Sequence, residues 1–219
     1  MPASWTKEPQ ISWDEKTKTK WVKRMKEHRA ADRLIRGSWL QDVDAPIGQR
    51  RGCFFGCAMQ TDENALEKAA KVMNIPLWLI NLSEGIFEGM PEENHLEFPV
   101  DLLEAIPCNV DLQAVEHEIA VIRLKKIRKH ASLNLGAFDR VIELHEVWRE
   151  ATREDWESAW ASAASESASA SESARASAWA SASASAWASA CESAWASSWD
   201  QERVALLDSL RGLSGKEAV

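Results

Sequence analysis

At 219 residues, the chain has the length of one large domain or of one domain with an extended element. Its formal net charge is −8, but residues 1–51 hold twelve Lys and Arg against seven Asp and Glu, so the remainder carries −13. The acidic body argues against general binding to duplex nucleic acid, and the chain has no run of about 20 apolar residues that would span a membrane.

The first segments of the chain are polar and basic. Residues 1–19 are predicted to be a flexible arm. Residues 20–40 place apolar side chains at helical spacing, which predicts an amphipathic helix with a stop at Gly37. Residues 41–59 contain three Gly and one Pro and are predicted to be a loop.

Two features favour a reduced, cytoplasmic protein. The N-terminal sequence MPASWTKEPQISW lacks the apolar segment of a secretory signal peptide. The cysteines stand at irregular spacings that do not form a disulfide framework, at Cys53, Cys57, Cys108 and Cys191.

The central part of the chain predicts several helices. Thr61 is a candidate N-cap, and Asn74 is a candidate end for the helix that follows. Pro76 suits the first turn of the next helix. With these, the predicted helices cover residues 61–73, 76–89, 100–106 and 112–133, and together with the helix at 20–40 they define a helical globular domain at 20–136.

Residues 156–199 contain a tetrapeptide repeat, x-[Ala/Glu]-Ser-Ala, with Trp often at its first position. Alternating Ala and Ser also fits a strand, but Ala favours helices and is depleted in strands. Because residues 137–211 contain no Gly or Pro, we predict an all-α protein: a small helical domain followed by a long repeat helix or helical hairpin at 137–212. A β-solenoid, a silk-like stack or disorder remain alternatives, and residues 213–219 are predicted to be a flexible tail.

The repeat predicts association between copies of the chain. A four-residue unit advances about 400° in a helix, so its first position moves by about 40° with each unit. An unbroken helix over 138–211 would measure on the order of 110 Å, which exceeds a compact monomer. We therefore expect the element to fold back or to self-associate, with an interface formed by Trp156, Trp160, Trp179, Trp187, Trp195 and Trp199. Replication slippage is an alternative origin of the repeat, and it does not exclude a structural role.

The sequence RRGCFFGC contains the best candidate for a binding site. Two guanidinium groups beside glycine-rich backbone could hold a phosphate or a carboxylate of a small ligand. The predicted ligand-binding residues are Arg50, Arg51, Gly52, Cys53, Gly56 and Cys57. The alternative is a surface loop whose two cysteines are buried as small apolar side chains.

Other chemical signals are weak. The Cys-x3-Cys pair supplies two of the four ligands that Zn²⁺ needs, so we expect no metal site and no cofactor. The groups around His117 and His145 have no H-E-x-x-H pattern, and we interpret them as solvated helix faces. No catalytic residue is predicted.

Two stretches, RGCFFGCAMQTDENALEKAA and IPLWLINLSEGIFEGMPEE, resemble a group of uncharacterised phage and bacterial proteins. That group carries an RGCxxGC-type stretch, an IPxWLxxLxExIFEGLP-type stretch and often an Ala-rich tail. The first stretch matches at Arg51, Gly52, Cys53, Gly56 and Cys57. The second matches at Ile75, Pro76, Trp78, Leu79, Leu82, Glu84, Ile86, Phe87, Glu88, Gly89 and Pro91, and it departs at Met90, where Leu is usual. The resemblance covers about residues 48–110 and implies no particular activity.

The combined expectation is a self-associating, non-enzymatic accessory protein of phage type. It would bind an anionic small ligand or a host protein, with counter-defence as one role. A Cys-dependent or metal-dependent enzyme and a purely structural assembly protein are the alternatives.

Overall fold

The structure is a computed structural model that describes residues 11–42, 44–61, 66–90, 92–130, 135–159, 161–162 and 199–213. These residues are helical apart from turns, loops and three isolated β-bridges, which confirms the all-α class. Most of the repeat lies outside the described residues. The predicted helix, hairpin or β-solenoid at that position therefore stays a prediction.

By its internal contacts the chain divides into two units. Unit 1 comprises Met1–Lys7 and Ala114–Glu192, and unit 2 comprises Glu8–Gln113 and Ser193–Val219. The chain thus leaves unit 2 after Gln113 and returns to it at Ser193, within the last part of the repeat. The predicted boundary at residue 137 stays a prediction, whereas the division by contacts falls after Gln113.

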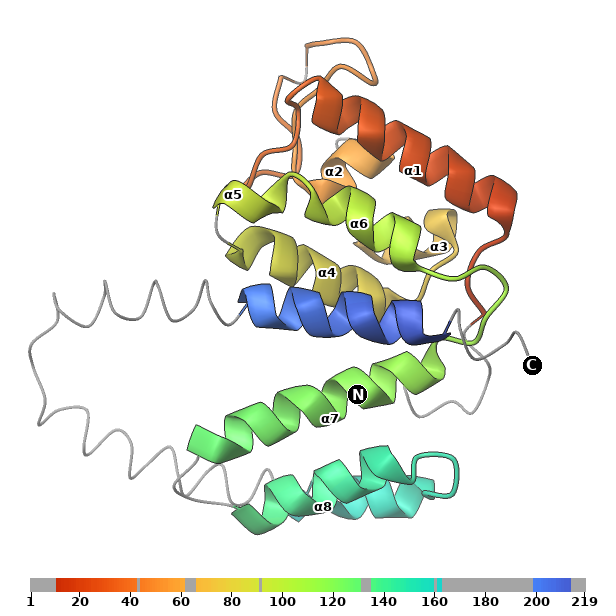
Figure 1. The fold of residues 1–219 in the computed structure, drawn as a ribbon, viewed down its shortest axis with the longest axis vertical. Helices are drawn as coiled ribbons and strands as arrows, with labels where there is room; N and C mark the ends of the chain where they lie inside the picture. Colours follow the sequence, from red (N-terminus) through yellow and green to blue (C-terminus); the bar gives the residue numbers. More distant parts are fainter. Residues whose placement is uncertain are drawn as a thin grey trace, which may run out of the picture. The chain divides into compact units, whose positions relative to one another are not determined.

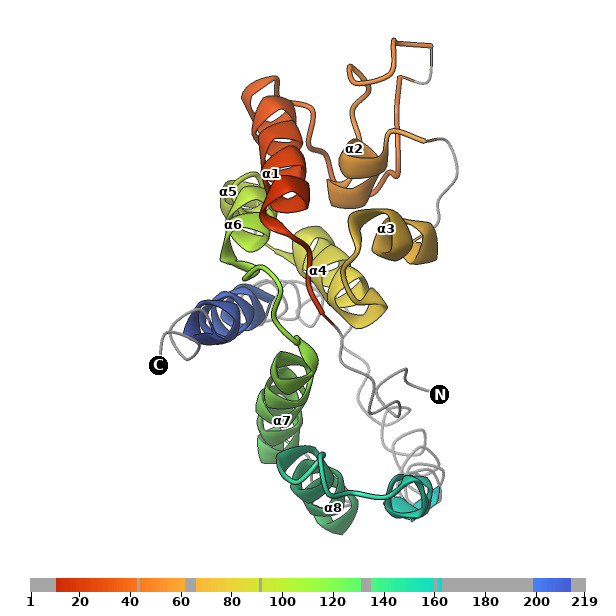
Figure 2. The same ribbon diagram turned by 90° about the vertical axis from the view of Figure 1, so that its right-hand side faces the viewer.

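Unit 2 is a cluster of short helices. Helix α1 packs against α6 and α2, while α2 also contacts α3 and α4 (Figures 1 and 2). A further helix at 199–213 runs alongside α4 (Figure 1). The labelled helices of this unit are α1 (Glu15–Ala30), α2 (Phe54–Met59), α3 (Leu66–Met73), α4 (Leu77–Gly89), α5 (Glu92–His95) and α6 (Phe98–Ala105).

Helix α1 begins earlier and ends earlier than the predicted helix at 20–40. Asp14 caps its first turn by accepting a hydrogen bond from the backbone N–H of Thr17 at 2.7 Å. At the other end, Asp32 adopts a left-handed conformation with φ 51°, and the N–H of Arg33 donates to the carbonyl of His28. This αL stop ends the helix before Leu34, whose apolar side chain had suggested that the helix continues.

The RGCxxGC stretch forms a helix start where a loop was predicted. Segment 33–41 wraps around Gly52, with hydrogen bonds from Ile35 N to Gly52 O at 2.8 Å and from Gly52 N to Arg33 O at 3.0 Å. A Cβ at Gly52 would lie 2.2 Å from the carbonyl oxygen of Trp39, and one at Gly56 would lie 1.6 Å from it. The two glycines are therefore required by a close backbone approach, which fixes the first turn of α2 against segment 33–41.

The core of unit 2 is aromatic and aliphatic. Phe54 and Phe55 stack with ring centroids 4.2 Å apart, and Phe54 also meets Phe87 and Phe98 at 6.4 Å. All four rings are fully buried. This cluster anchors α2 against α4 and α6 and thereby positions Cys53, which immediately precedes α2.

Helix α4 carries glycines on the face that meets the helix at 199–213. A Cβ at Gly89 would lie 2.2 Å from the indole of Trp199, and one at Gly85 would lie 3.4 Å from it. Gly85 and Gly89 are one turn apart, so their missing side chains leave room for this indole. Leu206, Leu207 and Leu210 of the same C-terminal helix are buried.

Unit 1 contains all but the first residue of α7 (Gln113–His130), together with α8 (Leu135–Glu146) and a further short helix that begins at residue 153. Helix α7 agrees closely with the predicted helix at 112–133. The buried cluster of this unit is formed by Val141, Leu144, Ala151, Trp156 and Ala159, with Leu124 and Trp148 packed against it. Among the described residues, no helix is both long and apolar enough to cross a bilayer.

Candidate metal centre

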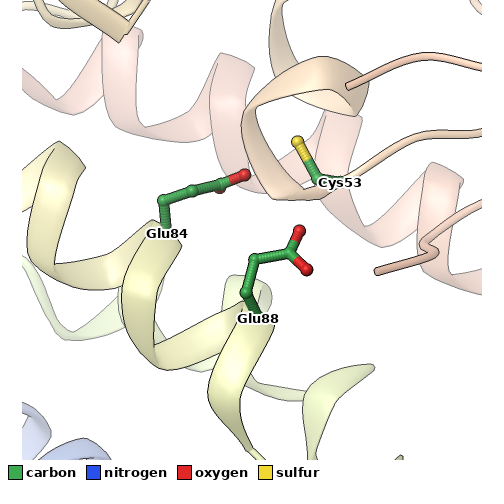
Figure 3. Close-up of side chains that lie close together, drawn as sticks. All are labelled: Cys53, Glu84 and Glu88. Atoms are coloured by element: carbon green, nitrogen blue, oxygen red, sulfur yellow. The ribbon is translucent and has the colours of Figure 1, made fainter. Parts of the chain in front are cut away.

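Three potential metal ligands meet where α2 begins beside α4. Cys53 is the N-cap of α2, and Glu84 and Glu88 project from α4 toward it (Figure 3). The Sγ of Cys53 and one carboxylate oxygen from each glutamate all lie within 4.8 Å of one another. The two glutamates share a helix face because they are four residues apart.

The surroundings of Glu84 disfavour its charged form. Burial, helped by the charge of Glu88, raises the pKa of Glu84 to about 7. The carboxylate accepts hydrogen bonds from the Cys53 thiol and from the backbone N–H of Phe55. Its Oε2 atom is buried and has no hydrogen-bond partner. A buried carboxylate oxygen without a partner is costly, and a cation would remove that cost.

Cys53 and Glu88 complete the cluster. Cys53 is only 2 % exposed, and its burial together with the charge of Glu84 raises the pKa of the thiol far above its usual value. Glu88 accepts a hydrogen bond from the backbone N–H of Gly37 at 2.7 Å. Without a cation, the thiol therefore keeps its proton at neutral pH, and Glu84 is about half protonated.

A cavity of about 260 Å³ adjoins the three side chains. Its remaining walls come from segment 37–39 and from the start of α3. The described residues that line it include no Lys, Arg or His, so the cavity is acidic; they are Gly37, Ser38, Trp39, Cys53, Leu66, Glu84 and Glu88.

The donor set matches a thiophilic divalent cation. Zn²⁺ accepts thiolate and carboxylate ligands at about 2.0–2.3 Å, whereas Mg²⁺ and Ca²⁺ prefer oxygen alone. Ligand atoms of a tetrahedral ion at those bond lengths are about 3.3–3.8 Å apart. The three donor atoms would therefore need to move closer to one another by on the order of 1 Å. Rotation of the two glutamate side chains can supply this movement.

The predicted ligand-binding residues are only partly brought together. Cys53 lines the cavity, but Arg50 donates from Nε to the carbonyl of Ala45 at 3.1 Å, and Arg51 donates from Nε to Asp42 at 2.8 Å. Neither arginine lines this cavity. Binding of an anion by the two arginines stays a prediction.

Gly56 and Cys57, two further predicted ligand-binding residues, are packed inside the fold. Gly56 contacts the backbone of Trp39, as described above. The Cys57 thiol is buried and donates to the carbonyls of Arg33 and Gly52 at 3.4 Å, and burial raises its pKa to about 12. Burial of both cysteines agrees with the alternative interpretation of this stretch, in which they are small core side chains.

Glu84 and Glu88 were not predicted as site residues. Both belong to the stretch that carries the resemblance, but nothing in the sequence indicates that they lie opposite Cys53, 31 or more positions away. Their i, i+4 spacing was the available signal, and it is common on solvated helix faces.

Unit 1 holds a second buried group of titratable side chains. The Nδ1 atoms of His117 and His145 are 2.8 Å apart, and His117 stacks on Trp148 at 4.6 Å. His145 meets the edge of Trp156 at 4.8 Å. His117 is 2 % exposed, so the expectation of a solvated face was wrong for this residue. The reason is that aromatic rings of the same unit cover it.

The tryptophans predicted to form an interface lie mostly outside the described residues, namely Trp160, Trp179, Trp187 and Trp195. Trp156 is 9 % exposed in the buried cluster of unit 1, and Trp199 packs against Gly85 and Gly89 in unit 2. Both therefore make contacts within the chain, and their role between copies stays a prediction.

Comparison with protein-family models, with curated proteins and with solved structures finds no significant match to this chain.

Proposed function

We propose that the protein binds a thiophilic divalent cation, with Zn²⁺ as its representative, through Cys53, Glu84 and Glu88. The observation that carries the proposal is the convergence of a thiol and two carboxylates within 4.8 Å, one carboxylate oxygen being buried without a partner. The acidic lining of the adjoining cavity supports a cation over an anion.

Cation binding would change the protonation of Cys53 and Glu84. A divalent ion favours the thiolate and the carboxylate, so Cys53 would lose its proton, as would the protonated fraction of Glu84. At pH 7 this amounts to release of about 1.5 protons per ion, since Glu84 has a pKa of about 7. The affinity should therefore rise by roughly 30-fold per pH unit near neutrality.

Isothermal titration of the full chain with Zn²⁺ tests the proposal. Cys53→Ser and Glu84→Gln should each lower the affinity by about 100-fold or more, because each removes a direct ligand. Titration in two buffers of different ionisation enthalpy should show the proton release.

Cys57→Ser is the matched control, because Cys57 is equally buried in the same stretch but is not part of the cluster. It should keep the Zn²⁺ affinity within about threefold. Glu84→Gln also guards against a folding artefact, since removal of a buried charge should stabilise the cation-free protein at pH 7.5. Equal affinities for Cys53→Ser and Cys57→Ser would refute the proposal.

The broader role expected from the sequence remains a proposal beside this one. A cation-binding core with a Trp-rich repeat fits a non-enzymatic accessory protein that self-associates, and the resemblance to phage and bacterial proteins supports that context. Light scattering at micromolar concentration tests self-association, and a monomeric mass would contradict it.

A further inference from the structure

Among the residues that the structure describes, the bound cation would have three protein ligands, one fewer than a closed tetrahedral site needs. Structural Zn²⁺ sites are closed by four protein ligands, whereas open sites have three and leave one position for an outside ligand. Among the described residues, the group that could hold an ion contains only Cys53, Glu84 and Glu88. Another polar side chain in the lining, Ser38, accepts a hydrogen bond from Gln41 at 3.2 Å, and its neutral hydroxyl is a poor Zn²⁺ ligand.

The cavity supplies the space for that outside ligand. Its volume of about 260 Å³ is below the usual range for drug-sized ligands, which limits the occupant to a small molecule. Gly37 adds no side chain to the wall, and nothing lies within 4 Å of the position that its Cβ would take. Trp39 and Leu66 contribute apolar side chains to the lining.

The charge of the site selects among possible ligands. One thiolate and two carboxylates around a divalent ion leave a net charge of −1. A further anion would add repulsion in a partly buried site, while a neutral donor would not. Neutral imidazole and amine nitrogens also suit Zn²⁺ as ligands.

We infer that the cation site keeps one coordination position open to the cavity, and that this position takes a small neutral nitrogen donor of the imidazole or primary amine class. The inference rests on the proposed function, because it requires the cation to bind first. It goes further by assigning an occupant to the cavity.

Visible absorption of the full chain loaded with Co²⁺ tests the inference, because the d–d bands of Co²⁺ report its ligands. Imidazole should shift these bands in a saturable titration. Azide, an anion of similar size, should bind at least about tenfold more weakly. A Co²⁺ spectrum unchanged by imidazole would overturn the inference and leave the proposed cation binding intact. Absence of Co²⁺ bands would overturn both, and azide binding as tight as imidazole would refute the charge argument.

Leu66→Trp provides the test of the cavity. The larger side chain should fill the space, so Co²⁺ should still bind within about threefold while the imidazole response is lost. Val72→Trp is the matched control, because Val72 is on the same helix and is 49 % exposed, away from the lining. It should keep both responses, and a full imidazole response in Leu66→Trp would contradict the assignment of the cavity.

Discussion

The two units each bury a group of titratable side chains, but with opposite surroundings. In unit 1, His117 and His145 bond to each other at 2.8 Å, and Trp148 and Trp156 lie against the imidazole rings. In unit 2, Glu84 leaves a buried oxygen without a partner, beside a cavity of about 260 Å³. Burial alone therefore does not mark a binding site. His117 also has a buried ring nitrogen, Nε2, without a hydrogen-bond partner, so an unpartnered atom does not separate the two groups. What distinguishes the group in unit 2 is the like charge of its two carboxylates and the adjacent space.

The two groups also respond to protons in opposite directions. Burial lowers the pKa of both histidines to about 4, below the value of a free imidazole, so the unfolded chain binds more protons than the folded one between pH 4 and 6.5. Their contribution to stability is therefore lost as the pH falls through this range. Burial raises the pKa of Glu84 to about 7. The buried charge of Glu84 therefore lowers the stability of the folded state as the pH rises from 4.5 to 7.

The largest effect should follow from removal of the packed imidazole in unit 1. We expect His117→Ala to lower the stability of this unit by about 2–4 kcal/mol, since it leaves a cavity between His145 and Trp148. Hydrogen exchange of amides in α7 and α8 should accelerate, while amides of α2 and α4 should not change. His117→Phe keeps the ring and should cost less; equal losses for Ala and Phe would show that the hydrogen bond, not packing, dominates.

A smaller effect of opposite sign should follow from neutralisation of the carboxylate in unit 2. Without cation at pH 7.5, Glu84→Gln should raise the free energy of unfolding by about 1–2 kcal/mol, because it removes a buried charge. At pH 5 most of this gain should disappear, since Glu84 is then largely protonated in the folded state. Urea unfolding followed by circular dichroism at both pH values measures the difference. A gain that is equal at pH 5 and 7.5 would contradict the pKa shift.

Saturating Zn²⁺ should reverse the order of stability of the native chain and the Glu84→Gln variant. The ion stabilises the native chain in proportion to its affinity, and Glu84→Gln loses that affinity. The variant that is more stable without cation should therefore be the less stable one with it. This reversal separates a functional cluster from a merely unfavourable one.

Local sequence signals predicted much of the fold, but not the cluster in unit 2. The stop at Asn74, where φ is 55°, and the start of α4 after Pro76 follow from side-chain and backbone preferences of single residues. Helix α2 was missed because Gly52 and Gly56 indicate a loop by composition, whereas their role is to admit the carbonyl of Trp39. That role depends on a contact between distant segments.

The same limit applies to the candidate site. Cys53 was identified from its own motif, but the pairing with Glu84 and Glu88 is set by the packing of α2 on α4. The Phe54–Phe87 contact that helps to fix this packing has no local signature. Likewise, nothing near His117 in the sequence indicates that Trp148 and Trp156 cover it.

The smallest effects should come from the two arginines next to Cys53, and they separate the predicted anion site from the cation site. The Arg51–Asp42 pair has both side chains about half exposed, so Arg51→Ala should leave the urea midpoint within error. Arg50 is less exposed and donates to the Ala45 carbonyl, so Arg50→Ala should cost about 1 kcal/mol.

Neither substitution should change the Zn²⁺ affinity by more than about twofold, because neither arginine lines the cavity. Titration with inorganic phosphate is the complementary measurement. If phosphate binds the native chain and the Arg50/Arg51 double alanine variant loses it while Zn²⁺ affinity is kept, the stretch serves two separate ligands. If Zn²⁺ affinity falls with the double variant, the arginines and the carboxylates belong to one site, and the contrast between an acidic cavity and a basic loop no longer holds.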